Sequence, residues 1–166
     1  MPEEETIEQA TAVALRPVAA SDEEFLLAVY AAARADEMAR VPWSLPQKEA
    51  FIKMQFDAQQ AHYRTHNPNA SHDVILLSGQ AIGRLYVARR DREIRILDIT
   101  ILPDYRNRGI GTPLIEDLMR EAAHADKPLT IYVESFNPSH GLFDRLGFSK
   151  IEDDGVNHLL EWRAQS

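Results

Sequence analysis

One segment, residues 97–112, constrains the possible fold of this chain more than any other. It reads LDITILPDYRNRGIGT, in which an apolar, β-branched run stops at Pro103 and the step Gly109-Ile110-Gly111 follows a short polar loop. Helical spacing of apolar residues continues to about residue 124, and a second apolar run covers residues 129–133. A strand, a helix and a strand in this order predict a crossover between two parallel strands of a sheet.

The rest of the chain predicts further strands and helices in a mixed arrangement. Residues 12–18 predict a short strand, and Ser21, with Glu24 three residues later, is typical of a capping box that begins a helix running to about residue 38. A longer helix is expected from about residue 46 to residue 66. The remaining predicted elements are strands at 73–77, 81–88 and 93–102, a helix at 109–124, a strand at 129–133, a helix at 138–146 and strands at 148–152 and 158–162. The predicted fold class is α/β, or α+β in some schemes.

Length and the N-terminal composition predict one domain. The chain has 166 residues, which fit one ordinary domain. Its first residues include Glu3, Glu4, Glu5 and Glu8 and few apolar side chains. We therefore expect a disordered acidic lead-in at residues 1–10 and a single domain at residues 11–166.

Charge and composition exclude several classes of function. The formal net charge is −8, and because phosphate-rich partners need a basic face, we expect no general nucleic-acid or anionic-membrane binding. The absence of cysteine excludes disulfides, thiolate zinc sites and a cysteine nucleophile. No apolar run approaches the roughly 18 residues of a membrane span, and the N-terminus is acidic, so the predicted location is cytoplasmic. The basic run at residues 89–92 includes Asp91 and fits a solvated turn better than an RNA-binding patch.

The Gly109-Ile110-Gly111 step predicts an anion site at the start of the following helix. Backbone N–H groups in a first helical turn have no partner within the helix and carry partial positive charge. Arg106 and Arg108 add two cations to the same segment. A dinucleotide-binding loop would need a third glycine where Leu114 stands, and the pattern of a Walker loop is absent. Two interpretations remain, a turn that binds another phosphate ligand and a glycine pair that only shapes the start of the helix.

Two motifs together resemble the GNAT superfamily of acyl-CoA-dependent N-acetyltransferases. The first is Arg106-x-x-Gly109-x-Gly111 after a strand that ends in an apolar-x-Pro step, and the second runs from Asn137 through a short predicted helix to Leu146-Gly147-Phe148. The resemblance covers roughly residues 12–162. It implies a mixed, mostly antiparallel central sheet of about seven strands with four helices and a parallel split between strands 4 and 5.

The resemblance implies that acetyl-CoA is the co-substrate and that no metal is needed. In such enzymes the pantetheine arm pairs with main-chain groups of one strand, which motif matching places here at Ile99, Thr100 and Ile101. The Ile101 N–H is the expected donor to the thioester oxygen as that oxygen gains charge. The expected pyrophosphate contacts come from the glycine turn, and further cofactor contacts from the second motif; these residues are Arg106, Asn107, Arg108, Gly109, Ile110, Gly111, Asn137 and Phe143.

The chain departs from the family pattern at the position of the usual base. The implied chemistry is direct attack of an amine on acetyl-CoA, without an acyl-enzyme, and an ammonium group must lose a proton first. Arg95 stands where many relatives have a glutamate, and an arginine cannot act as a base. Asp98 is the nearest carboxylate and is the predicted catalytic base, with Glu93 and Glu134 as alternatives. A structural role for Asp98, such as an ion pair with Arg84 on a neighbouring strand, is the alternative interpretation.

A second departure concerns the group that meets the leaving thiolate. Phe143 stands where relatives usually have a tyrosine, so it has no proton to give. Tyr132 or water is the expected substitute, and otherwise Tyr132 is a packed strand aromatic. The thiolate is a tolerable leaving group without an acid, because a thiol has a pKa of about 8.5. Arg95 and Phe143 also motivate a rival function, an acyl-CoA-binding sensor or scaffold module that has lost catalysis.

The acceptor side of the site is the least determined by sequence. The polar edge of the long helix at residues 46–66 falls where relatives build the acceptor wall, and its predicted contact residues are Gln55, Gln59 and Tyr63. The acidic balance favours a cationic acceptor, such as a small-molecule or peptide amine. A homodimer is compatible with the resemblance. His62 and His66 have zinc-like spacing, but Tyr63 stands where the metalloprotease pattern needs glutamate, so a solvated helix end is the preferred interpretation.

Overall fold

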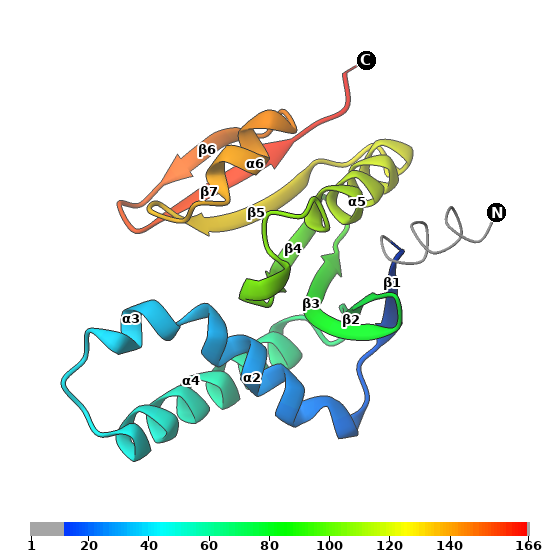
Figure 1. Ribbon diagram of the computed structural model, residues 1–166. Coiled ribbons are helices and arrows are strands. Elements are labelled where there is room, and N and C mark those ends of the chain that lie inside the picture. The colour runs from blue at the N-terminus through cyan, green and yellow to red at the C-terminus, as the bar shows by residue number, and fades with distance from the viewer. Residues whose placement is uncertain (1–11, 166) are drawn as a thin grey trace. The chain divides into compact units, whose positions relative to one another are not determined.

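A computed structural model describes residues 12–165 of the chain (Figure 1). The order of strands and helices follows the predicted one closely. The elements are β1 (Val13–Pro17), η1 (Ala20–Asp22), α2 (Glu23–Ala33), α3 (Ala35–Ala39), α4 (Leu45–His66), β2 (Ser71–Leu77), β3 (Gln80–Arg89), β4 (Ile94–Ile101), η2 (Pro103–Tyr105), α5 (Gly111–Ala125), β5 (Leu129–Glu134), α6 (His140–Arg145), β6 (Ser149–Asp153) and β7 (Asn157–Trp162).

The strands form a mixed sheet of seven strands in the order β1-β2-β3-β4-β5-β7-β6. Strands β4 and β5 are parallel, and their register pairs Ile94 with Leu129 and Ile96 with Ile131. Helix α5 connects these two strands, as the crossover pattern predicts. The pairs β1–β2, β5–β7 and β6–β7 are antiparallel. The predicted fold class, with its parallel step between strands 4 and 5, is therefore confirmed.

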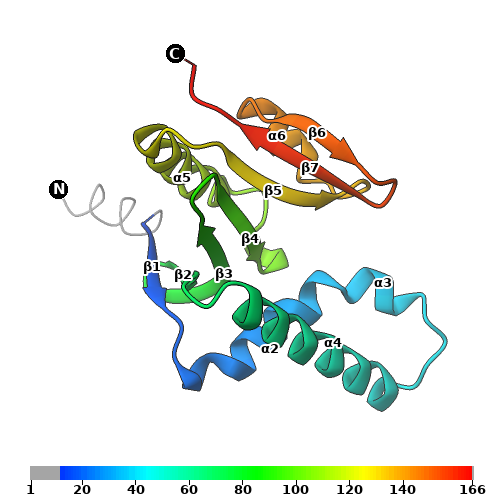
Figure 2. The ribbon, with the colours of Figure 1, turned by 180° about the vertical axis from the view of Figure 1, so that it is seen from behind.

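The chain divides into two compact units. The first unit comprises residues 12–85 and 99–108, and the second comprises residues 86–98 and 109–165. In the first unit, helices α2 and α4 lie side by side (Figures 1 and 2). Their buried contact contains Leu26, Tyr30, Ile52 and Phe56, with the rings of Tyr30 and Phe56 packed edge to face at 5.6 Å. Aromatic pairs at this separation stabilise a core beyond the area that they bury.

The second unit contains the predicted glycine-opened helix α5 and the C-terminal strands. The buried side of α5 consists of Leu114, Ile115, Leu118 and Ala122, at the spacing of one helical face. Strands β5, β7 and β6 lie next to one another (Figure 2). Within the described residues helix α5 has no side-chain cap at its N-terminus, so burial of this apolar face is the main source of its stability.

The N-terminal helix differs from its prediction in two ways. The predicted single helix is broken at Arg34 into α2 and α3, so the described chain has five α-helices where four were expected. The predicted Ser21–Glu24 capping box is wrong, because the N-cap residue of α2 is Asp22 and not Ser21. The carboxylate of Asp22 instead accepts the Ala19 N–H at 2.7 Å and two bonds from Arg16. In the part of the chain that the structure describes, the Asp22 side chain is thus bonded to residues that precede it and not to the N–H groups of α2.

Helix α4 carries a capping box that the sequence prediction missed. The Ser44 hydroxyl accepts the Gln47 N–H at 3.3 Å, and the Gln47 side-chain oxygen accepts the Ser44 N–H at 2.9 Å. The predicted acidic lead-in at residues 1–10 lies outside the described residues. Among the helices of residues 12–165, none has the length and apolar character needed to cross a membrane.

Candidate functional site

The turn between β4 and α5 has the backbone that its glycines predict. Asn107 and Gly109 both adopt left-handed conformations, with φ of 61° and 74°. A Cβ added to Gly109 would meet no atom within 4 Å, so this position needs glycine for its backbone conformation and not for space. Ile110 precedes the helix and Gly111 is its first residue. In the described chain no N-cap side chain bonds to this helix start, and the first N–H groups of a helix have no partner within the helix.

The two arginines of this turn lie in the first unit and are exposed. Arg106 Nε donates a hydrogen bond of 3.0 Å to the main-chain oxygen of Ile101. The guanidinium of Arg108 lies 5.4 Å from the centre of the Tyr105 ring. Arg106 is therefore anchored beside the strand end whose backbone is predicted to pair with pantetheine.

Asn137 and Phe143 of the second motif both serve the local structure of the second unit. The side-chain oxygen of Asn137 accepts the Ser139 N–H at 2.9 Å, a turn that leads into α6. The Phe143 side chain is only 2% exposed and packs edge to face on Phe148 at 5.1 Å. The structure therefore places the Phe143 ring in the core of the second unit. The cofactor contact expected of Phe143 stays a prediction.

Arg95, at the position of the usual base, is the centre of a polar cluster in the second unit. Its Nε donates to the Thr130 hydroxyl at 2.7 Å, and its Nη2 lies 2.8 Å from a carboxylate oxygen of Glu93. The same Glu93 oxygen lies 2.9 Å from Nη1 of Arg90. Two guanidinium groups thus contact one oxygen of the Glu93 carboxylate, and these ion pairs support a structural role for Glu93 over that of a base.

Tyr132 lies on the exposed side of β5. Its side chain is 51% exposed, so Tyr132 is not a core residue, and both its catalytic role and the alternative of a packed strand aromatic stay predictions. The Arg95 guanidinium lies 4.8 Å from the ring centre. The predicted base Asp98 is half-buried on β4 in the same unit. The structure thus places both predicted catalytic residues in the second unit, on the two parallel strands.

The polar edge of α4 holds a buried arginine that gives one of its glutamines a structural role. Arg84 on β3 is 1% exposed, and it donates to the side-chain oxygens of Gln59 at 2.5 Å and of Gln60 at 2.8 Å. Gln55 and Tyr63 are half-buried. Sequence reasoning missed Gln60. The signal that could have found this contact is a charged residue inside the apolar run of β3, since a buried cation needs polar partners.

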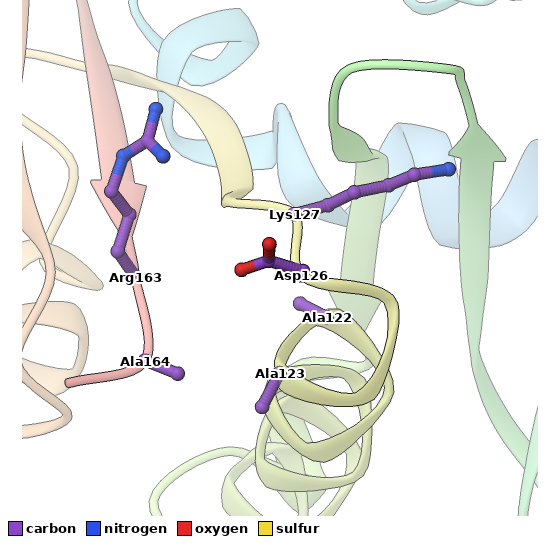
Figure 3. Close-up of a pocket in the computed structure, with 6 residues that line it drawn as sticks. All are labelled: Ala122, Ala123, Asp126, Lys127, Arg163 and Ala164. Carbon is purple, nitrogen blue, oxygen red and sulfur yellow. The ribbon is translucent and has the colours of Figure 1, made fainter. Parts of the chain in front are cut away.

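The remaining features add no further candidate centre. The rings of His62 and His66 lie 4.2 Å apart, and a ring nitrogen of His66 lies 2.9 Å from the His62 carbonyl oxygen. Residues 12–165 contain no group of three or more histidine, cysteine, aspartate or glutamate residues suited to a metal ion. A small cavity of about 80 Å³ lies at the C-terminal end of α5 (Figure 3), and it is lined by Ala122, Ala123, Asp126, Lys127, Arg163 and Ala164. None of these residues belongs to the predicted site.

The chain is similar in fold to solved acetyltransferases. The PaiA N-acetyltransferase from Thermoplasma acidophilum, solved in complex with coenzyme A, superposes with a TM-score of 0.70 at 15% identity, covering 93% of this chain and 100% of that one. An acetyltransferase from Thermus thermophilus gives a TM-score of 0.68 at 19% identity, with 93% and 99% covered. A GCN5-related N-acetyltransferase from Rhodopseudomonas palustris gives 0.64 at 21% identity, with 93% and 98% covered.

Sequence comparison points in the same direction. No curated protein sequence matches the chain. The model of the acetyltransferase (GNAT) family matches residues 30–148. This range spans most of the chain and includes both motifs, from the glycine turn at Gly109 to the Leu146-Gly147-Phe148 step. The chain therefore belongs to the GNAT family of acetyltransferases.

Proposed function

We propose that this acetyltransferase moves an acetyl group from acetyl-CoA to a primary amine by direct attack. The observation that carries the proposal is the turn of Asn107 and Gly109. Both residues take left-handed conformations there, and they lead into a helix start without a side-chain cap in the described chain. Such a helix start, beside Arg106 and Arg108, is suited to a pyrophosphate group. Membership of the acetyltransferase family gives this anion site its ligand class.

The proposed acetyl-CoA contacts follow the two motifs. Residues 106–111 bind the pyrophosphate through backbone N–H groups and the two guanidinium groups. The main-chain groups of Ile99, Thr100 and Ile101 pair with the pantetheine arm, and Asn137 lies near it. The relative from Thermoplasma acidophilum was solved with coenzyme A, which supports this ligand for the fold.

The proposed chemistry assigns three tasks to residues of this chain. An alkyl ammonium has a pKa of about 10.4, so Asp98 accepts its proton, directly or through water, before the amine nitrogen attacks the thioester carbon. The Ile101 N–H donates to the thioester oxygen while that oxygen carries negative charge. The attacking nitrogen then loses its second proton to water and the carbon–sulfur bond breaks. The Tyr132 hydroxyl or water protonates the leaving thiolate, and a tyrosinate formed in this way regains its proton from water.

The acceptor in this proposal is a small-molecule or peptide amine with a cationic character. The net charge of −8 favours approach of a cation, since long-range steering follows the net field. Gln55 and Tyr63 on α4 are the proposed acceptor contacts. Gln59 is also a proposed acceptor contact, and its side-chain oxygen already accepts a hydrogen bond from Arg84.

The decisive experiment measures thiol release from acetyl-CoA in the presence of a panel of amines. Release that depends on the amine, with a stoichiometric acetylated product, is the expected result. Tight CoA binding without amine-dependent release across the panel would favour the rival function, a sensor or scaffold module. The observation that favours this rival is that Arg95 is ion-paired and Phe143 is buried at the usual catalytic positions.

A binding experiment tests the cofactor half of the proposal separately. A ligand that binds only the folded state at 100 times its Kd adds about 2.7 kcal/mol to the free energy of unfolding. We therefore expect saturating CoA to raise the melting temperature by several degrees. The absence of any shift would contradict the assignment of residues 106–111 to pyrophosphate binding.

A further inference from the structure

Gly83 on β3 lies against the backbone of β4 more closely than any side chain would allow. A Cβ built on Gly83 would lie 2.2 Å from the main-chain oxygen of Thr100, 3.1 Å from Cα of Ile101 and 3.2 Å from the carbonyl carbon of Thr100. All three residues belong to the first unit. Alanine at this position therefore requires the backbone of β4 to move, because the obstructing atoms are main chain and not the end of a flexible side chain.

The position of this oxygen fixes the direction of the neighbouring N–H group. Side chains of a strand project out of the plane of the sheet, so the Thr100 oxygen occupies the space where a side chain of residue 83 would project. The peptide bond is planar, and the described residues contain no cis peptide bond. In a trans peptide the C=O and N–H of one unit point in opposite directions. The Ile101 N–H consequently points away from Gly83.

Two further hydrogen bonds hold the next peptide unit, between Ile101 and Leu102. The main-chain oxygen of Ile101 accepts Arg106 Nε at 3.0 Å. The next residue, Leu102, donates its N–H to the Ile82 oxygen at 2.8 Å, which ties the strand end to the residue before Gly83. The Thr100 oxygen thus lies over Gly83, and the hydrogen bonds to Ile82 and Arg106 fix the peptide that follows it.

We propose that Gly83 is a positioning residue for acetyl transfer. Its missing side chain admits the Thr100 oxygen, and this turns the Ile101 N–H toward the acetyl oxygen of the thioester. The inference rests on the proposed function, which assigns the Ile101 N–H to that oxygen. It adds a residue on a different strand, outside both family motifs, whose role is to aim the donor and not to touch the cofactor.

The test compares Gly83→Ala with Gly79→Ala as a matched control. Gly79 has a φ of 83°, and a Cβ there would meet nothing within 4 Å, so alanine strains the backbone just before β3 without crowding β4. The measured quantities are the Kd values of acetyl-CoA and of CoA, and kcat with an accepted amine. CoA lacks the acetyl oxygen, so the ratio of the two Kd values reports on the Ile101 N–H separately from overall stability.

We expect Gly83→Ala to weaken acetyl-CoA binding more than CoA binding and to lower kcat at least tenfold, in line with the loss of one oxyanion donor. Gly79→Ala should lower the melting temperature and leave the Kd ratio and kcat within twofold of the wild type. An unchanged Kd ratio and kcat in folded Gly83→Ala would overturn the inference. If the wild type itself binds acetyl-CoA and acetylates amines in that experiment, the proposed function stands while the inference fails.

A measurement on the wild-type protein decides the case in which Gly83→Ala does not fold. The amide resonance of Ile101 is followed by NMR during titration with CoA and with acetyl-CoA. A larger shift of this amide with acetyl-CoA than with CoA is expected, because only the thioester supplies the acceptor oxygen. Equal shifts with the two ligands would show that this N–H is not aimed at the acetyl group, and would overturn the inference.

Discussion

The guanidinium carbon of Arg95 lies 4.8 Å from the centre of the Tyr132 ring, so a cation on one parallel strand lies close to an aromatic ring on the next. The other contacts of Arg95, to Thr130 and Glu93, fix the plane of the guanidinium group. A fixed cation over an aromatic ring restricts the ring, while half of the Tyr132 side chain remains exposed. Arg95 thus packs against the residue proposed to protonate the leaving group.

The first prediction concerns the Tyr132 hydroxyl. Tyr132→Phe keeps the ring and its contact with Arg95 but removes the hydroxyl. Because a thiolate leaves readily without an acid, we expect kcat to fall by about tenfold, below the usual range for a general acid, with the Kd of CoA unchanged. Steady-state kinetics and calorimetric CoA binding measure the two quantities. An unchanged kcat between pH 6 and 9 would assign the proton to water.

The second prediction concerns the base. Asp98→Asn removes the proposed proton acceptor, and we expect kcat at pH 7 to fall by about a hundredfold while CoA affinity is retained. The defect should diminish toward pH 10, where solvent deprotonates the amine without help. The matched control is Asp57→Asn, which removes an exposed carboxylate paired with Lys53 on α4. A pH–rate profile of Asp98→Asn parallel to that of the wild type would exclude Asp98 as the base.

The third prediction concerns the phosphate contact. Arg106→Ala should weaken CoA binding about tenfold, which corresponds to about 1.4 kcal/mol for a charge-assisted hydrogen bond. The difference should shrink as salt is raised, because exposed charges are screened. The control is Arg120→Ala, since Arg120 is exposed on α5 and pairs with Asp117 on the same helix. Equal losses of affinity for both variants would indicate a nonspecific charge effect instead of a pyrophosphate contact.

Local sequence predicted the elements whose determinants are local. Helix α5 was predictable because its apolar residues recur at one spacing over the whole helix, and the turn at Gly109 because its left-handed backbone favours glycine. The break at Arg34 was not, because the residues around it favour a helix and no proline or glycine marks the interruption. Likewise, Asp22 at the start of α2 pairs with Arg16 six residues earlier, a contact that no capping pattern contains.

The site divides in the same way. The phosphate-binding turn was predictable, since its residues are contiguous in sequence. The surroundings of Arg95 were not, because its hydrogen-bond partner Thr130 is 35 residues away on the neighbouring strand. Gln59 was predicted as an acceptor contact from its place on the polar edge of α4, whereas its side chain accepts from Arg84, 25 residues later. Pairings between elements depend on strand register and helix packing, which a motif does not contain.

The fourth prediction concerns the C-terminal end of α5. Asp126 has a left-handed φ of 55°, and Asp126 and Lys127 donate their N–H groups to the carbonyls of Ala123 and Ala122. This is a Schellman motif, in which glycine is preferred, and a carboxylate there opposes the helix dipole. Asp126→Gly should raise the free energy of unfolding by about 0.5–1 kcal/mol, measured by urea denaturation. Asp126→Asn removes only the charge and should give a smaller gain; a loss of stability in the glycine variant would contradict the argument.

The last prediction is a pH dependence that the Arg16–Asp22 pair imposes on stability. Both guanidinium nitrogens of Arg16 lie 2.8 Å from the Asp22 carboxylate oxygens, and these bonds, followed by the Ala19 N–H, hold the pKa of Asp22 far below its ordinary value. The folded state therefore favours the ionised form. The stabilisation is complete above the unfolded pKa of about 3.9 and is lost as pH falls from there toward the lower folded pKa.

Asp22→Asn should accordingly be less stable than the wild type at pH 7, by several degrees in melting temperature. The difference between the two proteins should narrow as the pH falls from 5 to 3, because the wild type alone loses this contribution. Urea denaturation midpoints at pH 7, 5, 4 and 3 measure this difference in stability. The control is Asp57→Asn, because the exposed ion pair of Asp57 with Lys53 contributes little to the free energy of unfolding. A difference that stayed constant down to pH 3 would mean that packing around residue 22, and not its charge, stabilises the start of α2.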